Sequence, residues 1–535
     1  MALRLVPQPA ALALAALFSL VCAPGAHAQA DPVLFSGDPA PGGGSDFFDF
    51  SISGLEAAIN NLGHVGFSSD FTDPTGAGGV FRATTSALPV DPIIRIARSG
   101  EATPSGAVFN GIGGSTSIND AGIVAFFSTT STGHGIFVGD GVTRSEVMRQ
   151  GQLEPGGDGT LYFLGTGLAI NNPGQVAFSG GLSGTNGGGS DDQAIYRWDG
   201  VGQPLVQIVR KGDNAPGAGT FTGTAFQASQ VFNEPTMNDA GQVAFTAAIV
   251  GSADSFDNGI FLGNGTTITQ IARRGEAVPG GGGTFFNLST PALNNAGHAA
   301  FTANYLSNSN WDGVFRGNGS ITTAIAKTGD PAPDGSGLLR DTFSNHVALN
   351  DAGQVAFITA ITPNPGGQVR TGLFRGDGSV GGLDLIVREG MNSPDGDGVF
   401  SSIGSAGAFA MNEAGQILFT AGLDIDPNNV TPTEEFGLFL HDDDLGLLKV
   451  IRQNDPFLGS TVTSFYFAGN TVGRYHPDER SGLNDLGQVA FVFSLQDGRT
   501  GLAVWSIPEP ATFTTFALFA TLALLLRARR PASSQ

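Results

Sequence analysis

The hydrophobic residues of this chain fall into short extended stretches that recur in a fixed order, with polar turns between them. The clearest stretch follows an Asn-x-x-Gly step and ends in Phe, as in Asn238–Phe245 (NDAGQVAF). Eight copies occur, with successive Asn residues 52 to 72 positions apart. A period of this length predicts a repeat architecture. The Asn and Gly residues of the copies are Asn60 and Gly63, Asn119 and Gly122, Asn171 and Gly174, Asn238 and Gly241, Asn294 and Gly297, Asn350 and Gly353, Asn412 and Gly415, and Asn484 and Gly487.

Three further phrases accompany each copy. A Gly-aliphatic-Phe strand runs into a Gly-Asp/Asn-Gly turn, as in Gly259–Gly265, which is typical of a β-hairpin. A β-branched strand then ends in a basic residue, Gly and often an acid, as in Ile271–Glu276. After a Pro/Gly-rich loop comes a fourth apolar stretch, such as Gly283–Phe286. Four short strands in about 60 residues, with no sustained helical period, predict a blade of a β-propeller.

The two ends of the repeat region predict how the ring closes. The third phrase already occurs at Val33–Asp38, whereas the last strand of the series, Gly501–Trp505, belongs to the second phrase. We therefore expect an all-β, eight-bladed propeller of four-stranded blades, closed by pairing of the N- and C-terminal strands, which removes free sheet edges. Tandem sandwiches are the alternative, although 60 residues is small for a sandwich without disulfides. An open solenoid is a second alternative.

The repeated residues have structural interpretations. In each Asn-x-x-Gly step, Asn is expected to cap a turn and Gly to adopt a positive φ, although eight equivalent metal sites are an alternative. The Val-Ala-Phe stretch is interpreted as the inner strand, with Ala allowing close sheet approach and Phe filling the gap between blades. The basic residue of the third phrase is expected to form an ion pair with the acid three positions later, in the pairs Arg98/Glu101, Arg210/Asp213, Arg273/Glu276, Lys327/Asp330 and Arg452/Asp455.

The N-terminal segment, residues 1–28, reads as a secretory signal peptide. Arg4 supplies the positive region, Ala10–Val21 is a short apolar stretch, and Ala26 and Ala28 form an A-x-A cleavage site. Cys22, the single cysteine of the chain, lies inside this segment. The mature chain would therefore contain no disulfide, so its stability must come from packing.

The C-terminal segment, residues 508–535, reads as a membrane stop with the body of the protein outside. Sixteen mostly apolar residues, Ala511–Leu526, would span about 24 Å as a helix. The basic cluster after them would stay cytoplasmic. Before them stands Pro-Glu-Pro. The motif residues are Pro508, Glu509, Pro510, Arg527, Arg529 and Arg530.

This order of Pro-Glu-Pro, apolar helix and Arg cluster closely resembles the PEP-CTERM sorting signal of Gram-negative bacteria. The resemblance implies recognition and removal of the segment by an exosortase, transient anchoring in the inner membrane, and a host that makes extracellular polysaccharide. The repeats between residues 32 and 506 resemble the tandem NxxGxxAF surface-protein family, with departures such as Gly66, Ala299 and Ile417. That family implies surface display and no defined activity. The chain thus divides into 1–28, a propeller over 29–507, and 508–535.

Composition narrows the partners. Without Arg4, Glu509 and the three terminal arginines, the body keeps 21 basic and 46 acidic residues, a net charge of −25. Nucleic acid is not expected to bind such a field. One acidic turn, made by Asp442, Asp443 and Asp444 after His441, is a candidate Ca²⁺ site; no other cofactor is expected.

No catalytic pattern emerges from the remaining residues. The histidines of the body are scattered, and the chain has no G-x-S-x-G elbow. We therefore expect a non-enzymatic surface or matrix protein of the cell envelope. Its expected partners are the export machinery, an exosortase, and extracellular polysaccharide or surface proteins. The alternative is a secreted carbohydrate-active enzyme whose site is assembled from several blades in the propeller channel.

Overall fold

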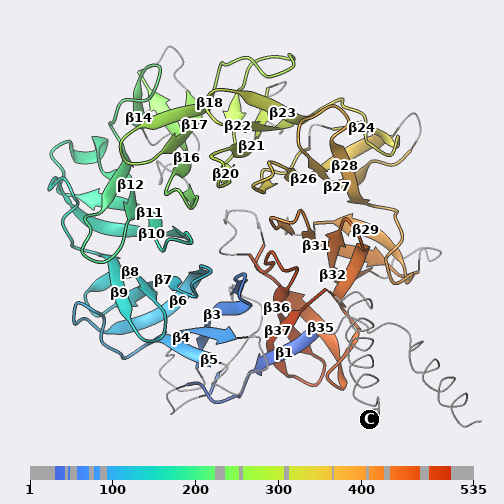
Figure 1. The fold of residues 1–535 in the computed structure, drawn as a ribbon, viewed down its shortest axis with the longest axis horizontal. Coiled ribbons are helices and arrows are strands. Elements are labelled where there is room, and N and C mark those ends of the chain that lie inside the picture. Colours follow the sequence, from blue (N-terminus) through green and yellow to red (C-terminus); the bar gives the residue numbers. More distant parts are fainter. Residues whose placement is uncertain are drawn as a thin grey trace, which may run out of the picture. The chain divides into compact units, whose positions relative to one another are not determined.

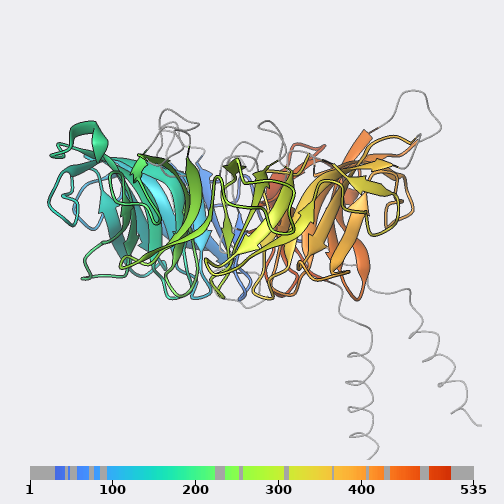
Figure 2. The same ribbon diagram turned by 90° about the horizontal axis from the view of Figure 1, so that it is seen from above.

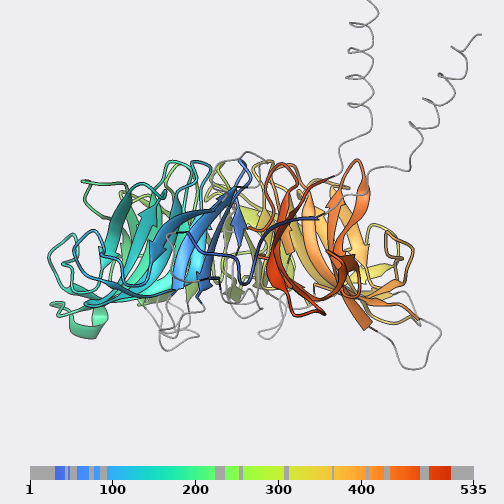
Figure 3. The ribbon, with the colours of Figure 1, turned by 90° about the horizontal axis from the view of Figure 1, so that it is seen from below.

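The computed structural model is an eight-bladed β-propeller, as the sequence predicts (Figure 1). Ala30–Val504 form one compact unit. The structure describes residues 30–41, 46–47, 57–71, 78–84, 93–222, 235–251, 257–305, 312–340, 342–363, 367–404, 409–426, 434–469 and 481–507. Seen from the edge, the strands of each blade run between the two faces of the ring (Figures 2 and 3).

The first four blades are four sheets that follow one another along the chain. Blade 1 contains β2 (Ala58–Ile59), β3 (His64–Asp70), β4 (Gly78–Thr84) and β5 (Ile93–Arg98). Blade 2 contains β6 (Phe109–Ile118), β7 (Val124–Thr130), β8 (Gly133–Gly139) and β9 (Arg144–Arg149). Blade 3 contains β10 (Thr160–Ile170), β11 (Val176–Ser183), the short 3₁₀ helix η1 (Gly188–Ser190), β12 (Gln193–Trp198) and β13 (Val206–Arg210). Blade 4 contains β14 (Thr220–Thr222), β15 (Thr236–Met237), β16 (Val243–Val250), β17 (Asn258–Gly263) and β18 (Ile268–Arg273).

The other four blades continue the series. Blade 5 contains β19 (Asn287–Leu288), β20 (Ala292–Leu293), β21 (Ala299–Asn304), β22 (Gly313–Gly317) and β23 (Thr322–Lys327). Blade 6 contains β24 (Gly337–Leu339), β25 (Ala348–Leu349), β26 (Val355–Pro363), β27 (Arg370–Gly376) and β28 (Leu383–Arg388). Blade 7 contains β29 (Val399–Ile403), β30 (Phe409–Met411), β31 (Ile417–Asp424), β32 (Glu434–Asp442) and β33 (Gly446–Arg452). Blade 8 contains β34 (Pro456–Phe457), β35 (Ser460–Tyr466), β36 (Val489–Leu495), β37 (Thr500–Trp505) and β1 (Ala30–Phe35).

Closure of the ring follows the prediction. The N-terminal strand β1 lies beside β37 in the sheet of blade 8, so one blade is built from both ends of the repeat region. Ser36 then donates its backbone N–H to the carbonyl of Thr500 at 2.9 Å. The sequence predicts that the N-terminal strand completes the eighth blade, and the structure confirms this pairing.

The order of strands within a blade corrects one interpretation. The Val-Ala-Phe strand is the second strand of its blade, because β16 pairs with β14 and β15 on one side and with β17 on the other. The first strand of each sheet is the stretch that precedes the Asn turn, as β6 is in blade 2 and β10 in blade 3, and β20 of blade 5 lies toward the ring centre (Figure 1). The Asn-x-x-Gly step thus joins the first and second strands, and a single stretch can be split in two, as in blade 4.

The aromatic residues fill the gaps between blades, as expected. In blade 4, Phe245 and Phe261 stack at 5.8 Å, and Phe221 meets Phe261 edge-on at 4.9 Å. These three rings share a buried cluster with Ala177 and Ile195 of blade 3. The same aromatic face against a small aliphatic face recurs around the ring. Such aromatic packing combines large buried area with favourable ring geometry.

The two ends of each blade form two faces of the ring. Val243, the first residue of β16, pairs with Gly263, the last residue of β17. The Asn turns and the hairpin turns between third and fourth strands therefore lie at the same end, which we call the turn face. The Pro/Gly-rich loops that lead from one blade into the next, here called entry loops, lie at the other end, the entry-loop face.

Candidate functional site at the channel mouth

Each Asn-x-x-Gly step forms a closed turn with its Asn buried. The eight glycines have φ between 70° and 86°, a region in which an L side chain is strained. In blade 4, Gly241 donates its N–H to the carbonyl of Asn238 at 2.9 Å. The Asn238 side-chain oxygen accepts the N–H of Gln242 at 3.0 Å. Because the eight Asn residues are at most 4% exposed, each side-chain amide must find its partners inside the protein.

The amide groups of these Asn residues link neighbouring blades. Seven of the eight Nδ2 groups donate to the backbone carbonyl of the Asn in the next blade, whereas that of Asn350 donates to Gln354 of its own blade. The seven bonds run from Asn60 to Asn119, Asn119 to Asn171, Asn171 to Asn238, Asn238 to Asn294, Asn294 to Asn350, Asn412 to Asn484 and Asn484 to Asn60, over 2.8–3.1 Å. The last of these bonds joins blade 8 to blade 1 across the closure.

The residue after each Asn forms a second ring that is complete. Its backbone N–H donates to the side-chain oxygen of the equivalent residue in the next blade. The eight bonds, of 2.6–3.0 Å, follow the order Asn61, Asp120, Asn172, Asp239, Asn295, Asp351, Glu413, Asp485 and back to Asn61. We call these residues the polar ring. A carboxylate that accepts a backbone N–H makes a stronger bond than a neutral acceptor does.

The polar ring surrounds a small central cavity. Its volume is about 80 Å³, and its lining comes from six different blades, so it lies on the ring axis. Asn61, Asp120, Glu413 and Asp485 contribute polar groups to its rim, while Ile59 is one of its apolar residues. Asp120 and Asp485 each accept hydrogen bonds with both carboxylate oxygens. Hydrogen bonds between neighbouring blades thus hold these acidic side chains close together.

Arginines add a further link on the turn face. In four blades the Gly-aliphatic-aromatic strand is followed by Arg, whose guanidinium donates to the carbonyl of the turn glycine in the next blade. The pairs are Arg82 with Gly122, Arg197 with Gly241, Arg316 with Gly353 and Arg375 with Gly415. The carbonyl left unpaired by each tight turn therefore gains a cationic donor.

The candidate Ca²⁺ turn is occupied by protein groups. Asp442 accepts the backbone N–H of Asp444 and that of Leu445, both at 2.9 Å, and the Gln416 amide at 2.7 Å. Burial alone would raise the pKa of the Asp442 carboxyl, but these hydrogen bonds outweigh it and hold the pKa below its usual range. Asp443 pairs with Arg375 at 2.8 Å, and Asp444 is exposed. In the part of the chain that the structure describes, no three His, Cys, Asp or Glu side chains are placed to hold a metal ion.

The predicted ion pair within the third phrase is wrong, for a geometric reason. The acid turns back to cap the backbone: Asp213 accepts the N–H of Arg210 at 2.7 Å, and Glu276 that of Arg273 at 2.8 Å. Asp330 and Asp455 do the same for Lys327 and Arg452. Glu101 instead pairs with Arg95 and Arg144, while Arg98 lies over the Phe71 ring.

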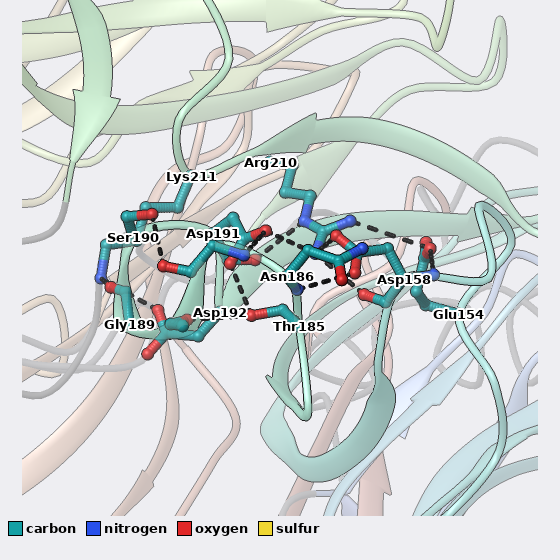
Figure 4. Close-up of polar contacts among 12 residues, drawn as sticks. Glu154, Asp158, Thr185, Asn186, Gly189, Ser190, Asp191, Asp192, Arg210 and Lys211 are labelled. Carbon is teal, nitrogen blue, oxygen red and sulfur yellow. Dashed lines mark hydrogen bonds and ion pairs between the residues drawn. The ribbon is translucent and has the colours of Figure 1, made fainter.

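The basic side chain, freed from that pair, holds the entry loop of its own blade. Figure 4 shows this around Arg210, which donates to the carbonyl of Asp158 at 2.9 Å and to its carboxylate at 3.1 Å. The same guanidinium reaches the Asp191 carboxylate at 3.3 Å, and Glu154 lies 3.8 Å away. Lys211 pairs with Asp192 beside it at 2.9 Å. Outer strand and entry loop are therefore bound together by charge.

The equivalent cations differ in what they hold. Arg273 pairs with Asp257, whose carboxylate is buried, with Nε to Oδ2 at 2.9 Å, and its remaining donors reach the Pro216 and Ala218 carbonyls. Lys327 instead donates to two carbonyls, those of Pro279 and Gly281. We call each outer-strand cation together with the entry-loop groups that it holds a clamp. The Arg273 clamp contains a buried ion pair, whereas the Lys327 clamp contains neutral acceptors.

Sequence reasoning missed the polar ring, although the signal is present in every copy. The residue after the repeated Asn is itself Asn, Asp or Glu in all eight copies. The predicted cleavage residues Ala26 and Ala28, and the motif residues Pro508 to Pro510 and Arg527 to Arg530, lie outside the described residues. Within the residues that are described, no helix is long and apolar enough to span a bilayer.

The Asn238 amide offers a test of the bonds between turns. Asn238→Asp keeps the acceptor for the Gln242 N–H but replaces by an oxygen the amide nitrogen that donates to the Asn294 carbonyl and to Gln242 Oε1. We expect a loss of about 1–3 kcal/mol in the free energy of unfolding. Burial beside another oxygen raises the pKa of the new carboxyl in the folded state, so stability should fall as pH rises above about 4.

Chemical denaturation at pH 4 and pH 8 measures both effects. Asn264→Asp is the matched control, because Asn264 is an exposed residue that caps a hairpin turn. In blade 2 the equivalent turn is already capped by an Asp, Asp140, so this position accepts the substitution. A similar loss in both variants would contradict the role assigned to the buried amides.

The two clamps make a second test. Arg273→Ala leaves the Asp257 carboxylate buried without its counter-ion, so we expect a loss of about 3–5 kcal/mol. Lys327→Ala removes bonds to neutral carbonyls at a more exposed site and should cost about 1 kcal/mol or less. Chemical denaturation of the two variants under identical conditions measures both free energies of unfolding. Equal losses would contradict the difference assigned to the buried ion pair.

Three solved structures are partly similar to this chain. This chain is similar to the dipeptidyl peptidase 4 of Porphyromonas gingivalis, with 10% identity and a TM-score of 0.45 over 85% of this chain and 57% of the peptidase. It is also similar to the GH74 xyloglucanase of Xanthomonas campestris, with 12% identity and a TM-score of 0.30 over 79% of this chain and 47% of that enzyme. The WD40 domain of SCAP from fission yeast is 10% identical, with a TM-score of 0.37 over 90% and 99% of the two chains.

The chain therefore spans about half the length of the two enzymes. No curated protein matches it in sequence. A family model covers residues 59–514, which includes all eight Asn turns and nearly the whole ring. The chain belongs to this family, which is described as a family of unknown function, DUF7453.

Proposed function

We propose that this chain is an exported propeller that is sorted to the cell surface or extracellular matrix of a Gram-negative bacterium and acts there by binding. One observation carries the proposal: the propeller begins at Ala30 and its last strand ends at Trp505. These positions adjoin the predicted cleavage site after Ala28 and the Pro508–Pro510 motif. The folded body thus lies between the predicted signal peptide and the predicted sorting signal.

The use of polar groups supports a role without catalysis. In the described residues, seven of the buried Asn amides, the polar ring and outer-strand cations such as Arg210, Arg273 and Lys327 bond to neighbouring blades or loops. A catalytic group needs a free face toward its substrate and a pKa suited to proton transfer or attack. The repeated groups instead serve as links, which suits a rigid display scaffold.

The partners proposed are the export machinery and an exosortase during sorting, and extracellular polysaccharide or a surface protein afterwards. Until processing, Ala511–Leu526 would hold the chain in the inner membrane. The strongly acidic body favours soluble display and argues against nucleic acid as a ligand.

A carbohydrate-active enzyme is the second candidate, and the channel mouth is the observation that favours it. Asp120, Glu413 and Asp485 converge there from three blades, as paired acids do in glycoside hydrolysis. The cavity of about 80 Å³ is nevertheless well below the roughly 300–1,000 Å³ of ordinary ligand pockets. Its carboxylates also accept backbone hydrogen bonds, so binding remains the first proposal.

Sorting is tested through the motif. Glu509→Ala should abolish processing if an exosortase reads this segment, so the full-length chain should accumulate in the membrane fraction. Asp426→Ala, an exposed acid of the ring, is the matched control and should be processed normally. Immunoblotting of membrane and released fractions measures the ratio. Normal release of the Glu509 variant would overturn the sorting proposal.

Binding and catalysis are separated with the released protein. Incubated with extracellular polysaccharide from its host, it should co-sediment with the polymer and leave the polymer length unchanged. Size-exclusion chromatography of the polymer and a reducing-end assay measure any cleavage. Shortening that disappears in Glu413→Gln but persists in Asp444→Asn, at an exposed acid away from the channel, would establish the enzyme reading instead.

A further inference from the structure

The turn face carries exposed aliphatic side chains in the hairpin turns of several blades, two or three residues after the Asp or Asn that begins the turn. In the described part of the chain, five of six hairpins between third and fourth strands place one there, and Thr266 stands in the sixth. Their exposed fractions range from 47% to 107%. The five residues are Val142, Val201, Ile321, Val380 and Leu445.

Two further aliphatic residues lie nearer the axis on the same face. Leu62 and Leu486 occupy the third position of the Asn turns in blades 1 and 8, where other copies have Ala or Pro, and both are more than 60% exposed. Side chains of this kind gain no stability from folding while water surrounds them. Single exposed apolar residues are common, but their recurrence in the turns of one face favours a surface that meets an apolar partner.

The chain leaves the ring at this same face. β37 is the third strand of blade 8 and runs from its hairpin with β36 toward the turn face, where it ends at Trp505. β1 begins beside it, at Ala30. Both apolar segments of the sequence are therefore attached to neighbouring strand ends on one side of the ring.

The connection to the C-terminal apolar segment is short. Five residues separate Trp505 from Ala511. Fully extended chain covers about 3.3–3.6 Å per residue, so the segment starts within ~20 Å of the turn face. Once Ala511–Leu526 enters a bilayer, the bilayer surface lies within that reach of the turns.

We propose that the turn face of the anchored chain lies against the lipid bilayer, with the exposed aliphatic residues of the hairpin turns in contact with it. This inference rests on the proposed function, because it requires the C-terminal segment to be in the membrane. The entry-loop face then points away and is the side open to a partner. The acidity of the body makes a zwitterionic surface the preferred one, since anionic lipid repels it.

Single-cysteine labelling tests the orientation, because Cys22 is the only cysteine of the chain. In the full chain with Cys22→Ala, a fluorophore is placed at Val142→Cys or Val380→Cys on the turn face. Leu153→Cys and Val250→Cys are the matched controls, being exposed aliphatic residues at the entry-loop end. The protein is reconstituted in phosphatidylcholine vesicles that contain a nitroxide-labelled headgroup lipid.

Turn-face labels should be quenched several-fold more strongly than the entry-loop labels. Equal quenching, or stronger quenching of the controls, overturns the inference. The combined variant V142S/V201S/I321S/V380S should reduce quenching of a label at Leu445→Cys, and unchanged quenching contradicts contact by these side chains. Vesicle flotation separates the two proposals: a chain that does not float refutes the membrane segment, whereas a floating chain with unquenched turn-face labels refutes this inference alone.

Discussion

The bonds between Asn turns are the constraint on which the ring depends. Every blade ends near the axis in a tight turn whose carbonyl and side-chain amide are removed from water, and a buried polar group without a partner is costly. The Asn238 amide donates one hydrogen bond to Gln242 of its own blade and the other to the carbonyl of Asn294, 56 residues away in the next blade. Neighbours must satisfy one another, and the series has a defined end only when Asn484 reaches Asn60. Closure is thus demanded by hydrogen bonding at the centre as well as by the strand pairing of β1 with β37.

Hydrophobic packing and charged groups stabilise the ring farther from its axis. Midway along each blade, stacked rings such as Phe245 and Phe261 meet the small residues of the preceding blade. Gly259 keeps this arrangement possible, because a Cβ there would lie 2.9 Å from the Phe261 ring and from the Ala272 carbonyl. At the outer edge, cations such as Arg210 and Arg273 hold the entry loops. Blades such as the third and fourth are therefore bound through amides at the axis, aromatic rings in the middle and ion pairs outside.

The fold could be predicted from the sequence because repetition reports which positions matter. The Asn, Gly and Phe positions, the number of blades and the strand exchanged between the ends are visible in the phrases themselves. Repetition does not report partners. Arg273 and Glu276 recur three positions apart, which favoured an ion pair, yet the bend brings the Glu276 carboxylate to the Arg273 backbone and sends the guanidinium to Asp257. The polar ring was missed for a similar reason: Asn61 and Asp120 are 59 positions apart, and only the circular arrangement brings them into contact.

Repetition also directs attention to the blade that departs from it. In blade 3, Tyr196 stands where other blades have Phe in the second phrase, and Glu154 stands where they have small or apolar residues such as Ala215 and Val278. Both side chains are buried, and within the described residues neither the Tyr196 hydroxyl nor Glu154 Oε2 has a hydrogen-bond partner. Burial, and then the nearby Glu154 carboxylate, raises the pKa of Tyr196. Among the described residues, this combination of a buried Tyr and a buried Glu occurs in blade 3, where it replaces apolar or small residues with two polar groups.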